Sequence, residues 1–399
     1  MAPRALKRGL VAVASLVAAD QLVQLTVLSD GELLGRRVAP FDPPLFSPAQ
    51  RAALETLRAQ LAEEARGAPV TSLFDADLGW CPTPDSEEGL CEHDWSGARL
   101  GASGPLARER TAGVRRVVLV GCSFTLGSEV RGEETWASQL DAARADLEVA
   151  NLGMGGYGLD QAILRFVRSG RALEPDEVWF GWLPEATLRA TTHFPPVMHH
   201  WTTIVQFKPR FWIDDADELH FARSPARSRA EALALIEDQA AFVAALAPTD
   251  LWVQRAPRAY APRGSDWTHR LASTRLLLTW HEAQERSIPR WIEDAQSRVY
   301  RLMRALLLRL DLEARKAGGR LRIVVLPSRD DLARARREER HWRPLLDDLR
   351  RIGLDSSDTS DALLAAGALE DDAFWMPRGH YAPRANEVVA KALEQALVR

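Results

Sequence analysis

Short apolar runs alternate with amphipathic segments through the centre and the C-terminal third of the chain. Apolar runs of this length, bounded by turn residues, are typical of buried strands, whereas apolar positions that recur every three or four residues indicate helices. The pattern predicts strands at residues 115–120, 148–152, 177–182 and 321–326. It predicts helices at residues 48–66, 136–145, 159–169, 289–317 and 385–398. Strands separated by helices favour a parallel sheet covered on both faces, an α/β fold.

Two parts of the chain do not follow this alternation. Residues 29–112 precede the first predicted strand and read as an N-terminal lead-in to an α/β domain at residues 113–399. Between about residues 192 and 289 the pattern dissolves into a stretch too long for a plain loop. We interpret it as a helical or irregular insertion, a lid or substrate-side subdomain. Its tryptophans suit either sugar stacking or ordinary packing, and they are Trp201, Trp212, Trp252, Trp267 and Trp280, with Trp291 just beyond.

The N-terminus is the only candidate for membrane association. Basic residues in the first eight positions precede an apolar run at residues 9–19, which Asp20 interrupts. A full span needs about 20 apolar residues, so residues 1–28 are predicted to be a signal peptide or a weak membrane anchor. Either one implies an exported or membrane-anchored protein of the bacterial envelope. The alternative is an amphipathic helix of a cytoplasmic protein.

Composition narrows the possible partners. The 399 residues include 51 basic and 55 acidic side chains, a net charge of −4, so no basic surface for nucleic acid is expected. The charged run at residues 330–344 is interpreted as a solvated helix. Three cysteines exclude a disulfide-dense scaffold and a four-cysteine zinc site. Cys81 and Cys91 are left open between a disulfide and two free thiols.

A serine follows the first predicted strand in the sequence Gly-Cys-Ser-Phe-Thr-Leu-Gly at residues 121–127. Ligands of parallel sheets bind beyond the carboxyl ends of the strands. Ser123 is the first hydroxyl at that end, and a helix that begins there would offer N–H groups to an anion. The alternative is a serine that only caps the helix.

A glycine cluster follows the second predicted strand. Residues 151–158 read Asn-Leu-Gly-Met-Gly-Gly-Tyr-Gly and contain the spacing of a dinucleotide fingerprint. The next strand, however, ends in Phe180-Gly181-Trp182 without the acid that would hold a ribose. The cluster suits a loop whose N–H groups face a reacting oxyanion, so no cofactor is predicted.

Histidines are the remaining candidates for catalytic or metal-binding residues. His380 lies in a loop just before the last predicted helix, where it can reach the same sheet edge as Ser123. The other group, His193, His199 and His200, has no carboxylate at ligand spacing, so no metal site is predicted.

Together these blocks resemble the SGNH, or GDSL-type, esterases and acyltransferases. VVLVGCSFTLG resembles the family's nucleophile block, NLGMGGYGLDQ its second block and HYAPRANEVVAKAL its terminal block. DADLGW, EVRGEETW and FKPRF resemble an exported subgroup. The resemblance implies a flavodoxin-like parallel sheet in a three-layer α/β/α sandwich. It implies that Ser123 is the nucleophile, that His380 is the general base, and that the N–H groups of Ser123 and Gly156 hold the oxyanion.

The chain departs from this family pattern at three positions. Cys122 stands where the family has an Asp, and Ala186 stands where it offers an Asn as a further oxyanion donor. No Asp lies two or three residues before His380, so Asp371 or Asp372 is expected to orient it if the loop folds back. The alternative is that both are solvated charges of the loop.

The expected function is a serine-dependent esterase or O-acyltransferase that acts on small acyl esters, with a carbohydrate ester as one substrate class. The alternative is a catalytically impaired pseudoenzyme, a ligand-binding or scaffold module in an envelope complex. Glu185 and Arg189, four residues apart, are candidates for the substrate cleft, with a surface ion pair as the other interpretation.

Overall fold

The computed structural model describes residues 2–26, 32–33, 36–37, 47–68, 72–198, 202–255, 271–285 and 288–398. His199, His200, Trp201 and Trp267 lie outside these ranges. The chain divides into two compact units. Unit 1 comprises Met1–Val70, Phe194–Gln206 and Arg229–Ser287, and unit 2 comprises Thr71–His193, Phe207–Ser228 and Ile288–Arg399.

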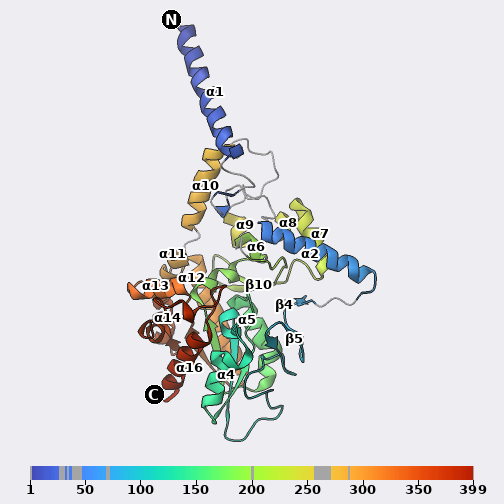
Figure 1. Ribbon diagram of the computed structural model, residues 1–399, viewed down its shortest axis with the longest axis vertical. Coiled ribbons are helices and arrows are strands. Elements are labelled where there is room, and N and C mark those ends of the chain that lie inside the picture. The colour runs from blue at the N-terminus through green and yellow to red at the C-terminus, as the bar shows by residue number, and fades with distance from the viewer. Residues whose placement is uncertain are drawn as a thin grey trace. The chain divides into compact units, whose positions relative to one another are not determined.

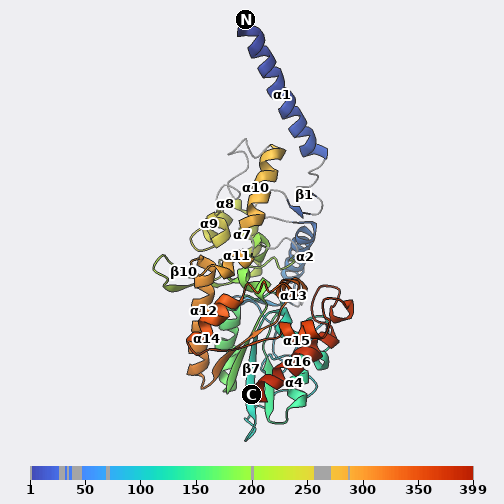
Figure 2. The ribbon, with the colours of Figure 1, turned by 90° about the vertical axis from the view of Figure 1, so that its left-hand side faces the viewer.

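Unit 2 is built on a parallel sheet of five strands (Figure 2). They are β7 (Arg115–Gly121), β8 (Leu147–Asn151), β9 (Glu177–Trp182), β12 (Arg320–Val325) and β13 (Asp355–Asp358). The strand order is β13-β12-β9-β7-β8, with every neighbouring pair parallel. In order of appearance this is the flavodoxin-like arrangement 2-1-3-4-5. The predicted α/β fold with a parallel sheet is confirmed.

The hydrophobic pattern found four of the five strands and missed β13. Its sequence is Asp-Ser-Ser-Asp, which has no apolar residue, and only pairing with β12 makes it a strand. The residues of β13 are exposed or only partly buried, so the strand carries no apolar run for the pattern to detect.

Helices cover both faces of the sheet, as Figures 1 and 2 show. On one face α5 (Leu159–Arg165) packs on β7 and α12 (Arg298–Lys316) packs on β12. On the other face α4 (Trp136–Ala143) packs against β8 and α16 (Pro383–Val398). Successive strand residues point to opposite faces, and the core beneath α4 and α16 takes alternate positions, including Val117, Leu119, Trp179, Val324 and Leu326.

The remaining elements of unit 2 lie around this sandwich. The helices are α3 (Ser123–Leu126), α11 (Ile288–Glu293), α13 (Arg329–Arg336), α14 (Arg343–Arg351) and α15 (Ser360–Ala365). Shorter turns are η2 (Gly132–Glu134), η3 (Phe166–Gly170), η4 (Arg171–Leu173), η5 (Pro184–Thr191) and η7 (Asp372–Phe374). The hairpins are β3 (Phe74–Asp75) with β4 (Gly79–Trp80), β5 (Glu87–Glu88) with β6 (Cys91–Glu92), and β10 (Arg210–Ile213) with β11 (Leu219–Ala222).

Two predicted helices differ from the observed ones. The segment 289–317 forms α11 and α12 rather than one helix, because Ser297 caps a new helix by accepting the Tyr300 N–H. The charged run at 330–344 is not a solvated helix throughout. Helix α13 ends at Arg336, and the turn after it buries His341 and Trp342. The three cysteines are free thiols.

Unit 1 is mainly helical. It contains α1 (Ala2–Thr26), α2 (Pro48–Ala65), α6 (Pro195–Met198), α7 (Arg229–Glu237), α8 (Gln239–Leu246), α9 (Leu251–Arg255) and α10 (Ala272–Glu285), with the short pair β1 (Glu32–Leu33) and β2 (Arg36–Arg37). Helix α2 packs against α7 through ion pairs, among them Arg58 with Glu237 at 2.8 Å.

Helix α1 is long and apolar enough over Lys7–Thr26 to cross a membrane. The charge that interrupts its apolar run has a structural role. The carboxylate of Asp20 accepts hydrogen bonds from the N–H groups of Ala272 and Ser273 at 2.6 and 2.9 Å, where α10 begins. These N–H groups have no partner within their own helix, so Asp20 joins α1 to α10.

Candidate active site

Ser123 lies directly beyond the carboxyl end of β7. Gly121 has a φ of 155°, and a Cβ atom there would come within 2.2 Å of Thr125 Oγ1 and 2.6 Å of the Gly181 carbonyl oxygen. Glycine is therefore required for the tight turn from β7 into α3. The N-cap of α3 is Cys122, which makes no side-chain cap, so Ser123 is not the capping residue. Ser123 occupies the first turn of α3 and is largely buried.

Two backbone N–H groups, one in the serine turn and one in the glycine loop, are candidates for binding an anion. In α3 the N–H groups of Thr125 and Leu126 both donate to the Cys122 carbonyl, at 3.0 and 2.9 Å. Within the described part of the chain, the N–H groups of Ser123 and Gly156 have no acceptor. These are the two groups that the sequence resemblance assigns to the oxyanion.

Glycines bring the serine turn and the glycine loop into direct contact. A Cβ atom on Gly153 would lie 2.5 Å from the Leu126 nitrogen and 2.9 Å from the Thr125 carbonyl carbon. Asn151 bridges the same segments, because its Nδ2 donates to the Thr125 carbonyl at 2.8 Å and its Oδ1 accepts the Gly153 N–H at 3.0 Å. The glycine loop is thus locked against α3.

The glycine loop also abuts η5, which follows β9. A Cβ atom on Gly158 would lie 2.9 Å from the Ala190 nitrogen and 3.0 Å from the Arg189 carbonyl carbon. The other side of the loop is anchored by Trp80, whose Nε1 donates to the Gly155 carbonyl at 2.8 Å and whose carbonyl accepts the Tyr157 hydroxyl at 2.5 Å. Segments that follow three different strands therefore meet at one edge of the sheet.

His380 reaches this edge from the loop before α16. Its ring lies beside that of Phe124, the residue after Ser123, with 5.3 Å between ring centroids. Its Nδ1 atom is 2.5 Å from the Glu129 carboxylate. With Nδ1 engaged, Nε2 is the nitrogen available to take a proton from a nucleophile. Sequence blocks around residues 123 and 380 are therefore brought together.

Glu129 takes the orienting position that the sequence analysis assigned to Asp371 or Asp372. One of its carboxylate oxygens contacts His380, and the other accepts the Arg378 N–H at 3.1 Å. Asp371 instead pairs with Arg384 at 2.5 Å, and Asp372 pairs with Arg329 at 2.7 Å. The expectation for these two aspartates is corrected. The segment before His380 does fold back, with the Met376 N–H donating to the His380 carbonyl at 2.8 Å, but both aspartates lie ahead of this hairpin and pair with arginines.

The available signal for Glu129 was its position in EVRGEETW, a stretch noted only as a subgroup feature. Glu129 has a φ of 72°, in the left-handed region that is uncommon for residues other than glycine. This conformation directs the chain after α3 and cannot be read from hydrophobic pattern. Backbone strain of this kind often accompanies functional sites.

The environment of His380 favours its neutral form. Burial lowers the pKa of His380, the Glu129 carboxylate opposes that shift, and the charges of Arg378 and Arg189 lower the pKa further. A general base must be unprotonated to act. The net direction therefore keeps the imidazole competent at neutral pH.

Glu185 and Arg189 do not pair with each other in the structure. Glu185 lies near Asp331, and burial followed by the Glu185 charge raises the pKa of Asp331 to about 7 although Ser328 hydrogen bonds oppose it. Asp331 also lies 3.6 Å from His341. Arg189 points toward the glycine loop, donating to the Tyr157 carbonyl at 3.5 Å. Ala186, which stands where the family pattern offers an Asn, is buried and has no side-chain donor.

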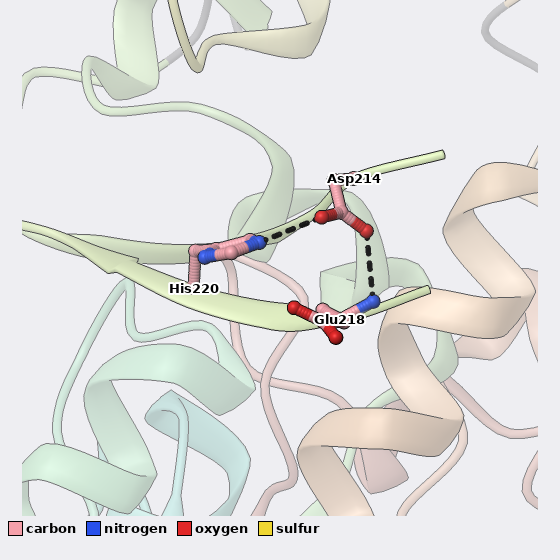
Figure 3. A group of neighbouring side chains, drawn as sticks. All are labelled: Asp214, Glu218 and His220. Carbon is pink, nitrogen blue, oxygen red and sulfur yellow. Dashed lines mark hydrogen bonds and ion pairs between the residues drawn. The ribbon is translucent and has the colours of Figure 1, made fainter. Parts of the chain in front are cut away.

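Of the three histidines considered as metal ligands, only His193 lies among the residues that the structure describes. His193 is buried, its Nδ1 lies 2.8 Å from the Lys208 carbonyl, and burial lowers its pKa to about 3. Asp214, Glu218 and His220 in the β10–β11 hairpin do have ligand atoms within 4.8 Å of one another (Figure 3). Asp214 already accepts from the Glu218 N–H and contacts His220 Nε2, both at 2.9 Å.

No family model and no curated protein matches the chain. Solved structures are similar to it. One is a member of the lipolytic G-D-S-L family from Veillonella parvula, which is 10% identical with a TM-score of 0.36, the match covering 72% of this chain and 100% of that one. Another is a lipase/acylhydrolase from Enterococcus faecalis, 12% identical with a TM-score of 0.32, covering 71% and 95%. A third is an acetyl xylan esterase, 12% identical with a TM-score of 0.33, covering 71% and 99%. The similar structures thus include lipolytic G-D-S-L proteins and acetyl xylan esterases.

Proposed function

We propose that the protein is a serine-dependent ester hydrolase or O-acyltransferase. The observation that carries the proposal is the contact between Glu129 and His380, at 2.5 Å, beside the turn that presents Ser123. An acid, a base and a hydroxyl at one sheet edge form the arrangement of a serine hydrolase. The N–H groups of Ser123 and Gly156, which have no acceptor among the described residues, are the proposed donors to the oxyanion.

The proposed reaction begins when His380 removes the proton of the Ser123 hydroxyl. The serine oxygen attacks an ester carbonyl, and the N–H groups of Ser123 and Gly156 hold the negative oxygen of the tetrahedral intermediate. Glu129 stabilises the imidazolium that forms. The leaving alcohol takes the proton from His380, and an acyl-enzyme remains. Water or another hydroxyl group then attacks the acyl carbon, which releases acid or a new ester.

The acceptor is the point on which hydrolase and transferase differ. The carbohydrate expectation rested on the subgroup resemblance and on tryptophans that suit either sugar stacking or packing, and Trp252 and Trp291 are buried. Trp280 is 63% exposed and available to a ligand or surface. We therefore propose a small acyl ester as the substrate, with acceptor preference set by the test below.

A fluorophosphonate probe tests the proposal directly. We expect labelling of the wild-type protein, none of Ser123→Ala, and strongly slowed labelling of His380→Ala. Product analysis with p-nitrophenyl acetate, with and without added xylo-oligosaccharide, then separates hydrolysis from transfer. Labelling that persists in Ser123→Ala would rule out this nucleophile. An unlabelled wild-type protein would favour the pseudoenzyme, which the substitutions at Cys122 and Ala186 make the competing hypothesis.

We further infer that α1 attaches the protein to a membrane as a retained anchor. The helix continues without a break past Ala19, and Asp20 is bound to α10. Membrane fractionation followed by intact-mass measurement tests this inference. The full-length chain is expected in the membrane fraction, and a mature N-terminus at Asp20 would contradict it.

A further inference from the structure

The candidate site lacks a side-chain hydrogen-bond donor at the end of β9. At the end of β9 the family resemblance expects a side-chain amide, and this chain has Ala186, whose methyl group belongs to the apolar core. Two backbone N–H groups alone would then face the oxyanion. Removal of one such donor typically costs a factor of about 10²–10³ in rate. A substitute would have to come from the same edge of the sheet.

Arg189 lies in η5, three residues beyond Ala186, and its backbone touches the glycine loop. The close approach of Gly158 to the Arg189 carbonyl carbon, 3.0 Å from a Cβ atom built there, fixes the base of the side chain beside Gly156–Gly158. Its Nη1 makes one long hydrogen bond of 3.5 Å to Tyr157, the residue after Gly156. The guanidinium is therefore held next to a proposed oxyanion donor.

The guanidinium is buried but not neutralised. Arg189 is only 7% exposed, and in the described part of the chain no carboxylate forms an ion pair with it, Glu185 included. Among the residues that the structure describes, its Nε and Nη2 atoms have no acceptor, yet they are not sealed from solvent. A buried cation without a counter-ion is costly, so its open N–H groups are suited to receive a negative charge.

The charge of Arg189 also acts on His380. Burial is the largest cause of the lowered pKa of His380, and Arg189 contributes to the lowering together with Arg378. Geometry connects the two residues through α3. Arg189 contacts the glycine loop at Tyr157, the loop packs against α3 through Gly153, and the ring of Phe124 in α3 lies 5.3 Å from that of His380.

We propose that Arg189 is the third oxyanion donor of this site, taking the role for which Ala186 has no group. When the bond between Ser123 Oγ and the carbonyl carbon forms, the π electron pair moves to the carbonyl oxygen, and an Arg189 N–H donates to that oxygen. On collapse the pair returns, the bond to the leaving oxygen breaks, and His380 protonates the alcohol. This inference rests on the proposed esterase function.

Kinetics of Arg189→Gln, Arg189→Lys and Arg378→Gln test the role of the side chain. We expect kcat of Arg189→Gln on p-nitrophenyl acetate to fall about 10²-fold with little change in KM, because the donor acts mainly in the transition state. Arg189→Lys keeps a charge and should recover part of the loss. Arg378→Gln removes the other arginine that acts on His380 and should lower kcat less than about threefold.

A boronic acid that forms a tetrahedral adduct with Ser123 gives a second readout. Its affinity is expected to fall in Arg189→Gln by a factor similar to that of kcat, whereas thermal unfolding shows whether the variant remains folded. A raised KM with an unchanged kcat would overturn the inference, because it would make Arg189 a site for a substrate anion. Unchanged kcat and boronate affinity would overturn it as well.

Fluorophosphonate labelling separates this inference from the function on which it rests. If the wild type is labelled at Ser123 and Arg189→Gln keeps full kcat, only the role of Arg189 fails. If the wild type is neither labelled nor active, the esterase proposal fails and takes this inference with it.

Discussion

Glu129 holds the imidazole of His380 across 251 residues of sequence, through a 2.5 Å contact to Nδ1. Both side chains are mostly removed from solvent, with exposed fractions of 13% and 16%. Glu129 follows the serine block at residues 121–127 by two positions, so the two candidate groups come from one short segment. One stretch of about ten residues brings the proposed nucleophile Ser123 and, on the turn after α3, the carboxylate that contacts His380.

Replacing Glu129 by Gln is expected to lower kcat by a factor of about 10²–10⁴. The amide can donate to Nδ1 and so favour the wrong tautomer, and it cannot stabilise the imidazolium. Kinetics on p-nitrophenyl acetate measure the effect. Asp371→Asn and Asp372→Asn serve as matched carboxylate controls, because both residues pair with arginines away from His380. A larger loss in either control than in Glu129→Gln would contradict the assignment.

The activity should depend on pH through His380. Because burial and two arginines lower the pKa of His380, kcat/KM should reach half of its plateau below pH 6.5, the ordinary histidine value. Removing Arg378 takes away a cause of lowering, so its Gln variant should move this midpoint upward. Rate profiles between pH 4 and 9 provide the measurement. A wild-type midpoint clearly above 6.5 would be inconsistent with the environment of His380.

Adding a methyl group at Gly158 should damage the site by displacing η5. A Cβ atom there has no room against Ala190 and Arg189, and overpacking of this kind costs about 1–3 kcal/mol. We expect Gly158→Ala to lower both the unfolding temperature and kcat. Gly155→Ala in the same loop is the control, since a Cβ atom on Gly155 meets nothing within 4 Å. Equal effects of the two substitutions would argue against steric contact as the cause.

Asp331 should make stability depend on pH. Ser328, Glu185, Arg334 and His341 face its carboxyl group, and burial is the main reason that its pKa is raised from 3.8 to about 7. The folded state therefore binds a proton that the unfolded state has lost between pH 4 and 7, so this group favours folding less as pH rises through that window.

Asp331→Asn cannot ionise and keeps an acceptor for Ser328. Its unfolding temperature relative to wild type is accordingly expected to increase by several degrees from pH 4 to pH 7. Differential scanning fluorimetry at a series of pH values measures the difference. A constant offset between the two proteins over this range would show that the carboxyl group of Asp331 titrates normally.

Local sequence was sufficient for most of the sheet and for the centre of the site. The apolar runs that form β7, β9 and β12 are buried over most of their length, so composition alone identifies them, and the edge strand β8 is partly buried. Gly121, Gly153 and Gly158 mark close contacts in which a Cβ atom has no room. These strands and turns depend mainly on residues that are adjacent in the sequence, so the sequence pattern is enough to identify them.

Only the tertiary structure decides features that depend on contacts between residues far apart in the sequence. The polar strand β13 exists because β12 offers it a pairing edge, and Asp20, which interrupts the apolar run of α1, binds the first N–H groups of α10. The partner of His380 was equally hidden, because a left-handed turn at Glu129 and the loop before α16 have to meet. Short-range periodicity records burial and turns, whereas the choice among several nearby carboxylates is made by the three-dimensional path of the backbone.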